Sequence, residues 1–347
     1  MNITFFIGNG FDINIGLKTK YSDFYPYFKN RSQEKNMIRN WIDGHEQDWA
    51  DLEEKLGQEI EKVLEEELGK FYEDKEELDK LLIEYLESEQ RKYIFEDKGQ
   101  IIKEFSRSML DFSSGLPMDD VESIKETMEK YKNEEFIYSY IIFNYTNILD
   151  KIIELYNNNS RVISNHQCNS GVRGNYIGKA IHIHGTTNEE MILGVNDDGQ
   201  IKNDFLKKDS LFLDTFIKKR MNRSIGQRKT DMVLETINKS HIICIFGMSL
   251  GNTDKMWWEE LIKWLITNEN NKLVIFWKGY EAALKRKLPS TLIRLNEQIR
   301  KEIYGKGKGK YDDSYYSKIK NRIMISYNSD IFSLPKIQEN KITEKNV

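Results

Sequence analysis

The sequence predicts an α/β protein whose core is a doubly wound, mostly parallel β-sheet, with a helical insertion. Short apolar runs typical of buried strands alternate with stretches in which apolar residues recur every three or four positions, the spacing of one helix face. The first apolar run ends in a glycine turn, as the opening unit of many nucleotide-binding α/β proteins does. Between residues 31 and 135, in contrast, only the helical spacing is found.

Seven apolar runs are predicted to be strands. The first, residues 2–7, ends at a turn rich in glycine. The run 241–246 is almost continuously apolar, as expected of a central parallel strand that helices cover on both faces. The other five runs are residues 136–143, 161–164, 180–183, 272–277 and 322–326.

These patterns divide the chain into three parts. We expect residues 1–30 and 136–335 to form one α/β core and residues 31–135 to form the helical insertion. Residues 336–347 are expected to be a polar tail. In the insertion, Leu52, Leu56 and Ile60 illustrate the apolar helical spacing.

Composition excludes several classes of protein. The 347 residues carry a net charge of −4, so no overall basic field attracts nucleic acid, which is an unlikely partner. The two cysteines lie far apart, which argues against a disulfide framework and a structural zinc site. The residues after Met1 carry no basic n-region and no long apolar run, and no stretch of the sequence reaches the apolar length of a membrane span. We therefore expect a cytoplasmic protein with no membrane partner, and homo-oligomerisation stays open.

The first candidate site is the turn Gly8-Asn9-Gly10-Phe11-Asp12. Its glycines would allow a diphosphate to approach the backbone closely. The third glycine of a dehydrogenase fingerprint is replaced by Ile13, which disfavours hydride-transfer chemistry. An ordinary strand–turn–helix corner explains the same residues equally well.

The second candidate is Asn144, which follows the predicted strand 136–143. Ligands of α/β sheets bind at the carboxyl ends of the strands. The amide of Asn144 can donate and accept hydrogen bonds, so it could hold a ribose hydroxyl or a water molecule. A simpler interpretation is that Asn144 caps the helix that follows.

The third candidate is the segment His182-Ile183-His184-Gly185. On a strand, His182 and His184 share one face, and a histidine at a strand end can act as a general base. We favour His184, because it lies at the strand terminus. Metal binding is a rival interpretation, but the next nearby acid is only Glu189, so no metal is expected. A structural histidine is the remaining alternative.

Two further turns carry polar side chains. Gly194-Val195-Asn196-Asp197 offers an amide and the carboxylate of Asp197. The segment 247–254 follows the most apolar strand, and its glycines and hydroxyls could surround a ribose and a phosphate. Both segments could equally be plain turns, with Asp254 as a helix cap.

Taken in order, these motifs resemble the AbiH family of phage abortive-infection proteins. The resemblance spans roughly residues 1–265. It is carried by Gly8-Asn9-Gly10-Phe11-Asp12, Gly16-Leu17-Lys18-Thr19-Lys20-Tyr21-Ser22-Asp23-Phe24, Trp49-Ala50-Asp51-Leu52-Glu53, Phe143-Asn144-Tyr145-Thr146, His182-Ile183-His184-Gly185, Gly194-Val195-Asn196-Asp197 and Phe246-Gly247-Met248-Ser249.

The same order of motifs is similar to the wider sirtuin-like, Rossmann-type fold, in which such residues line an NAD pocket. That resemblance implies that Asn144 and His184 are catalytic. The residues it implies for binding NAD are Gly8, Asn9, Gly10, Asp12, Thr19, Asp197, Gly247, Ser249 and Asp254. Deacetylase sirtuins carry paired CxxC motifs, and this chain has none. The NAD-hydrolysing sirtuin-like proteins of phage defence are the better analogy.

The resemblance therefore implies an antiphage effector that hydrolyses NAD to ADP-ribose and nicotinamide. Asn144 would orient a water molecule and the ribose hydroxyls, and His184 would act as the base. Such an enzyme needs restraint in uninfected cells, so a phage-derived trigger is expected. The alternatives are a module that senses NAD or ADP-ribose without turnover, and an ADP-ribosyl transferase.

Overall fold

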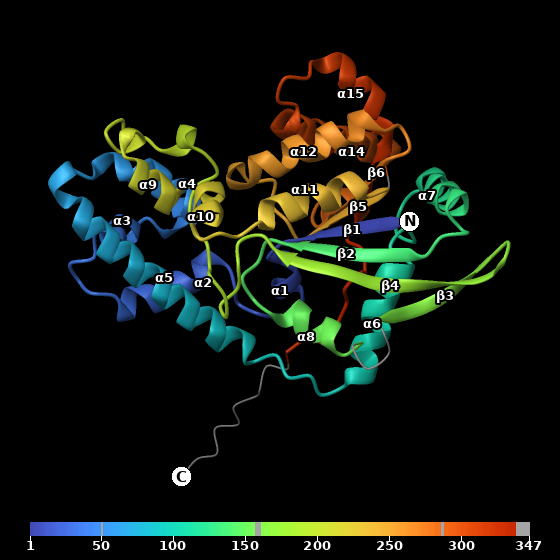
Figure 1. Ribbon diagram of the computed structural model, residues 1–347, viewed down its shortest axis with the longest axis horizontal. Helices are drawn as coiled ribbons and strands as arrows, with labels where there is room; N and C mark the ends of the chain where they lie inside the picture. The colour runs from blue at the N-terminus through green and yellow to red at the C-terminus, as the bar shows by residue number, and fades with distance from the viewer. Residues whose placement is uncertain (50, 157–160, 286–287, 338–347) are drawn as a thin grey trace, which may run out of the picture.

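The computed structural model describes residues 1–49, 51–156, 161–285 and 288–337 (Figure 1). At its centre is one seven-stranded sheet. The strands are β1 (Asn2–Ile7), β2 (Phe136–Ile142), β3 (Val162–Cys168), β4 (Gly171–His182), β5 (Ile242–Phe246), β6 (Lys272–Trp277) and β7 (Ile323–Tyr327). Their order across the sheet is β3-β4-β2-β1-β5-β6-β7, and every neighbouring pair is parallel except β3 and β4.

The predicted mixed α/β architecture with a mostly parallel sheet is confirmed. β1 and β6 have the predicted bounds. β2 and β5 differ from the prediction by one residue at one end, and β7 is shifted by one residue at both ends. The prediction was wrong for the fourth strand in the chain, which begins at Gly171 rather than at residue 180. β3 likewise extends to Cys168, and the two strands form an antiparallel hairpin at the edge of the sheet.

The register of the sheet brings several strand ends to one edge. Ile7 at the end of β1 is aligned with Ile142 of β2 on one side and with Phe246 of β5 on the other. Ile142 is aligned in turn with His182, the last residue of β4. The loops that follow these four strands therefore leave the sheet together, at its carboxyl edge.

Helices cover both faces of the sheet (Figure 1). Side chains alternate between the faces along a strand, so Phe5 of β1 belongs to one hydrophobic core and Phe6 to the other. The helices on the Phe5 side are α1 (Gly10–Asn14), α6 (Lys98–Leu110), α7 (Met118–Lys130) and α8 (Ile148–Glu154). Those on the Phe6 side are α11 (Lys229–Lys239), α12 (Lys255–Thr267), α14 (Pro289–Gly307) and α15 (Asp313–Ile319).

A third hydrophobic cluster lies beside the carboxyl edge of the sheet, and we call its helices the helical lobe (Figure 1). The lobe consists of α2 (Tyr21–Arg31), α3 (Met37–Ile42), α4 (Leu52–Glu59), α5 (Leu68–Gln90), α9 (Ser210–Phe216) and α10 (Lys218–Ser224). The remaining helix is α13 (Glu281–Lys285). Short 3-10 turns are η1 (Glu46–Trp49), η2 (Ile60–Lys62), η3 (Glu65–Glu67), η5 (Asp198–Gln200), η6 (Leu206–Lys208), η7 (Asn252–Asp254) and η8 (Lys320–Arg322).

Every described element between residues 32 and 135 is helical, but these helices lie in two different parts of the molecule. Those before residue 91 belong to the helical lobe, whereas α6 and α7 pack on the sheet. Two parts of the sequence prediction fall on residues that the structure does not describe. These are Ala50 and residues 338–347 of the expected polar tail. Ile337, just before them, donates its backbone N–H to the carbonyl of Ile15 at 3.0 Å.

Candidate functional site

A cavity of about 610 Å³ lies between the carboxyl edge of the sheet and the helical lobe. Its size falls within the range of small-molecule sites, about 300–1,000 Å³. The predicted site residues that line it are Gly8, Asn9, Gly10, Asp12, Thr19, Asn144, His184, Gly247, Ser249 and Asp254. Asp197 does not line this cavity. It borders a neighbouring hollow and caps η5, because its Oδ1 accepts the Gly199 N–H at 2.9 Å.

The glycines of the turns after β1 and β5 are in contact with each other. The N–H of Gly10 donates to the carbonyl of Gly247 at 2.7 Å, and the N–H of Gly8 donates to that of Phe246 at 2.9 Å. A Cβ atom on Gly10 would lie 2.4 Å from the Gly247 Cα, and Gly247 has a φ of +68°. These glycines therefore allow two backbone turns to meet, and the N–H groups of Gly8 and Gly10 are used within the protein.

The turn after β5 presents a different face to the cavity. Met248 and Ser249 line the cavity, and their backbone N–H groups have no hydrogen-bond acceptor among the described residues. Asn9 and Thr19, in contrast, bind each other. The Asn9 amide donates to the Thr19 carbonyl at 2.9 Å, and the Thr19 hydroxyl donates to Asn9 Oδ1 at 2.6 Å. Donors for an anion are thus available on the β5 side of the cavity.

Asn144 is fixed by a buried carboxylate. Its Nδ2 donates to Asp12 at 2.9 Å, and the Thr146 hydroxyl also donates to both Asp12 oxygens at 2.9 Å. Burial raises the pKa of Asp12 to about 7, although these two donors lower it. Asn144 Oδ1 is buried and has no partner among the described residues. Since the N-cap residue of α8 is Asn147, the interpretation of Asn144 as a helix cap is wrong.

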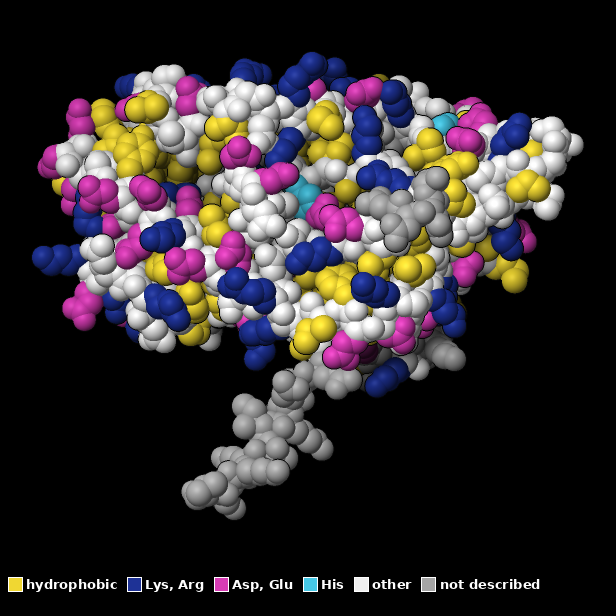
Figure 2. All heavy atoms as spheres, turned by 60° about the horizontal axis from the view of Figure 1, so that its bottom comes forward, with side chains coloured by type: hydrophobic (Ala, Val, Ile, Leu, Met, Phe, Trp, Pro, Cys, Tyr) yellow, Lys and Arg dark blue, Asp and Glu magenta, His cyan; other side chains and the backbone are white. Residues whose placement is uncertain are grey.

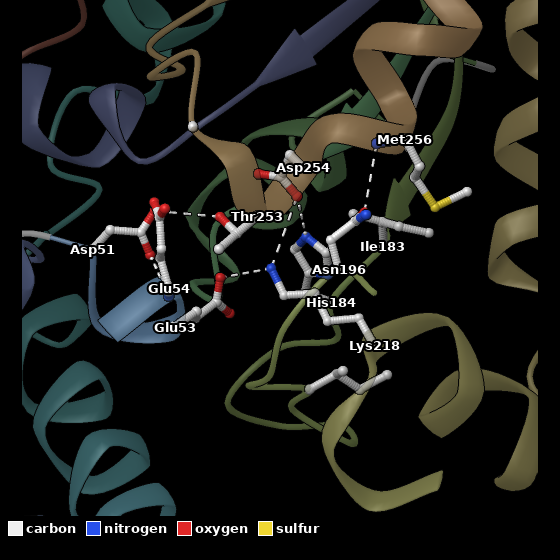
Figure 3. Close-up of polar contacts among 12 residues, drawn as sticks. Asp51, Glu53, Glu54, Ile183, His184, Asn196, Lys218, Thr253, Asp254 and Met256 are labelled. Carbon is white, nitrogen blue, oxygen red and sulfur yellow. Dashed lines mark hydrogen bonds and ion pairs between the residues drawn. The ribbon is translucent and has the colours of Figure 1, made fainter. Parts of the chain in front are cut away.

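His184 belongs to a chain of charged groups that joins the sheet to the helical lobe (Figure 3). Its Nε2 lies 3.1 Å from Asp254 Oδ1. Lys218 Nζ lies 3.8 Å from the same oxygen and donates to Glu53 Oε2 at 2.6 Å. Glu53 also accepts the Tyr145 hydroxyl at 3.1 Å. These side chains come from α4, α10 and the segments after β2, β4 and β5, and all of them line the cavity.

Burial and neighbouring charges shift the pKa of several groups in this chain. Burial raises the pKa of Glu53 to about 7, although the charge of Lys218 lowers it. Burial, followed by the charge of Lys218, lowers the pKa of His184 to about 4. Burial alone would raise the pKa of Asp254, but Lys218 and His184 outweigh it and hold this pKa at about 2. At neutral pH, an ionised Asp254 therefore accepts a hydrogen bond from Nε2–H of a neutral His184. Nδ1 keeps its lone pair and has no partner among the described residues.

His182 lies outside the cavity lining. Its Nε2 is 2.7 Å from Asp150 Oδ2, and its Nδ1 is 3.5 Å from the carbonyl oxygen of Asn144. The ring therefore supports the backbone beneath Asn144. Of the two histidines in the motif, His184 is the one that lines the cavity.

Sequence reasoning gave no role to Glu53, Lys218 or Thr146. Glu53 and Thr146 belong to motifs that carry the AbiH resemblance. Nothing in their local pattern indicates that Glu53 binds Lys218 or that Thr146 binds Asp12. Lys218 is one of many lysines, and no motif marks it. Its importance follows from burial beside Glu53, a contact between α10 and α4 that only the tertiary fold produces.

Outside the cavity, acidic and basic side chains are mixed over the face that Figure 2 shows. In the part of the chain that the structure describes, no group of three or more His, Cys, Asp or Glu residues could hold a metal ion. None of the described helices combines the length and the apolarity that crossing a bilayer requires.

The fold and the site define a class: α/β proteins with a cavity at the carboxyl edge of a mostly parallel sheet, closed on one side by a helical lobe. Within that class, the chain belongs to the bacteriophage abortive infection AbiH family, whose model matches residues 4–277. Membership implies a role in phage abortive infection. No curated protein matches the chain.

Proposed function

We propose that this protein is an abortive-infection effector that hydrolyses NAD to ADP-ribose and nicotinamide. The observation that carries the proposal is a pair of buried, unpartnered acceptors on residues that line one cavity, Asn144 Oδ1 and His184 Nδ1. Buried polar atoms normally have a partner. Ribose hydroxyls and a water molecule are donors that would satisfy both atoms.

The topology supports a dinucleotide as the ligand. With the antiparallel edge strand β3 set aside, the strand order is β4-β2-β1-β5-β6-β7. This is the pattern of doubly wound sheets, which bind dinucleotides where the order reverses, here between β1 and β5. The cavity lies over this point. Met248 and Ser249 line it, and their N–H groups, which have no acceptor among the described residues, are suitable donors for a diphosphate.

The protein has to supply few chemical groups for this reaction. Nicotinamide leaves as a neutral group with the electrons of the glycosidic bond, and the barrier is an oxocarbenium-like ribosyl centre. Asn144, held by Asp12, would orient the ribose hydroxyls and the attacking water. His184 would accept the proton that this water loses on forming its bond to the ribosyl carbon. The carboxylate of Asp254 would favour the positive charge of the transition state.

Nicotinamide release from NAD by the purified protein, with and without lysate of phage-infected cells, tests this function. Asn144→Ala and His184→Ala should each lower the rate about 10²–10⁴-fold. His182→Ala is the matched control and should cost less, because its ring lies outside the cavity lining. Circular dichroism checks that each variant is folded.

Each outcome has a distinct meaning. Wild-type turnover in all three variants, or an inactive His182→Ala beside an active His184→Ala, contradicts the proposed roles. Binding of NAD without any nicotinamide release would replace the hydrolase with a sensor. Labelled ADP-ribose attached to protein or nucleic acid would replace it with a transferase.

A further inference from the structure

Lys218 is a buried ammonium group at the wall of the cavity. Its side chain is 7% exposed, as is that of Glu53, which it contacts at 2.6 Å. The residue opens α10, and its backbone N–H donates to the carbonyl of Val195 at 3.0 Å. Both the backbone and the charged end are therefore held in place.

Burying a charge in this way is costly unless partners compensate it. Glu53 supplies one partner and is fixed in turn by the Tyr145 hydroxyl. Asp254 supplies the second at 3.8 Å. Burial alone would lower the pKa of Lys218, but Glu53 and Asp254 raise it, so the ammonium stays charged.

We propose that Lys218, held by Glu53, is a positioning residue that keeps His184 neutral, with Nδ1 free to accept a proton. The inference rests on the function proposed above. Its basis is one shared atom, because Asp254 Oδ1 contacts both His184 Nε2 and Lys218 Nζ. The lysine charge opposes a second positive charge on the ring, and the carboxylate fixes which ring nitrogen carries the hydrogen.

The other charged groups around His184 do not replace Lys218. Asp254 faces the ring from the start of α12, and it favours protonation of the ring. Lys229 of α11 opposes protonation, but less than Lys218 does, and it is paired with Glu189 at 3.2 Å. The Tyr145 ring lies 6.5 Å from the His184 ring, with its hydroxyl on Glu53. Lys218 is ion-paired with Asp254, the carboxylate that contacts His184.

The test is an NMR titration of the His184 ring in the full protein without NAD, with the signal assigned by its loss in His184→Asn. In Lys218→Met, the titration midpoint should rise from about 4 towards the ordinary histidine value of 6.5. Because this variant leaves buried carboxylates unpaired and could unfold, Glu53→Gln/Lys218→Met removes both charges of the pair. The midpoint should rise in this double variant as well. Lys229→Met is the matched control and should shift it less.

The acidic limb of the rate of nicotinamide release should move to higher pH in the same variants, and Lys218→Arg should restore it in part. An unchanged His184 midpoint in the folded double variant would overturn the inference, as would an equal shift in Lys229→Met. A shifted midpoint in a protein that does not consume NAD supports the positioning role and refutes the hydrolase. The two failures are therefore distinguishable.

Discussion

At the residue scale, Asp12 organises the cavity without needing to touch a ligand. Asp12→Asn keeps the shape but leaves one acceptor oxygen for two donors, Asn144 Nδ2 and the Thr146 hydroxyl. An unsatisfied buried polar group costs about 1–3 kcal/mol. We expect that loss in urea denaturation, together with slower nicotinamide release. Asp150→Asn is the control, since Asp150 contacts His182 outside the cavity lining. Equal losses of stability and of nicotinamide release in both variants would contradict this role of Asp12.

The site residues at strand ends could be predicted from the sequence. Asn144, His184 and Gly247 follow apolar runs, and parallel strands bring their carboxyl ends to one edge. Asp197 follows no strand. Its carboxylate caps η5 and accepts the Asn196 side-chain amide at 2.7 Å. Lys218 and Glu53 lie on helices more than 160 positions apart, so their contact depends on tertiary packing that no local pattern encodes.

At the scale of elements, the turns after β1 and β5 depend on each other. In Gly10→Ala, the new Cβ would meet the backbone of Gly247 at 2.4 Å, and no side chain can move aside. Overpacking typically costs about 1–3 kcal/mol, and a clash with backbone should reach the upper end of that range. Thermal unfolding of Gly10→Ala should therefore occur at a clearly lower temperature.

The matched control for this contact is Gly69→Ala. Gly69 lies in α5, and a Cβ there would meet nothing within 4 Å. Alanine is favoured over glycine in a helix by about 0.5–1 kcal/mol, so this variant should be as stable as the wild type or slightly more stable. Wild-type stability in Gly10→Ala would show that the turns can separate freely.

The hairpin β3–β4 shows where element prediction fails. Its strands carry polar residues and three glycines, Gly171, Gly174 and Gly178, which strands generally disfavour. The strand signal was found only at residues 161–164 and 180–183, although β4 pairs with β2 from Asn175 onwards. The apolar runs of β1 and β6, buried against helices on both faces, carry the signal along their whole length.

At the scale of the whole molecule, the site is the junction of two separately packed units. The sheet has a hydrophobic core on each face, and the helical lobe has its own. Polar contacts cross the junction: Lys218 with Asp254, Tyr145 with Glu53, and Thr253 with Asp51 at 3.4 Å. A change in the charge of this junction therefore acts on folding and on the cavity together.

The pH dependence of folding follows from that junction. His184 has a pKa of about 4 in the folded protein and about 6.5 when unfolded, so between these values the unfolded chain binds more protons. Its contribution to stability is thus fully present above pH 6.5 and is lost as the pH falls towards 4. Two to three pKa units correspond to roughly 3 kcal/mol. Asp12, with its raised pKa, acts in the opposite sense below pH 7.

The contribution of His184 is isolated by comparing the wild type with His184→Gln, because all other titrating groups are common to both. Urea denaturation from pH 7 to pH 4 should show the wild type losing stability relative to the variant as the pH falls. The neutral glutamine can still donate to Asp254, so the variant keeps that partner without the proton equilibrium. A constant difference over this range would mean that the ring of His184 is not held neutral by the fold.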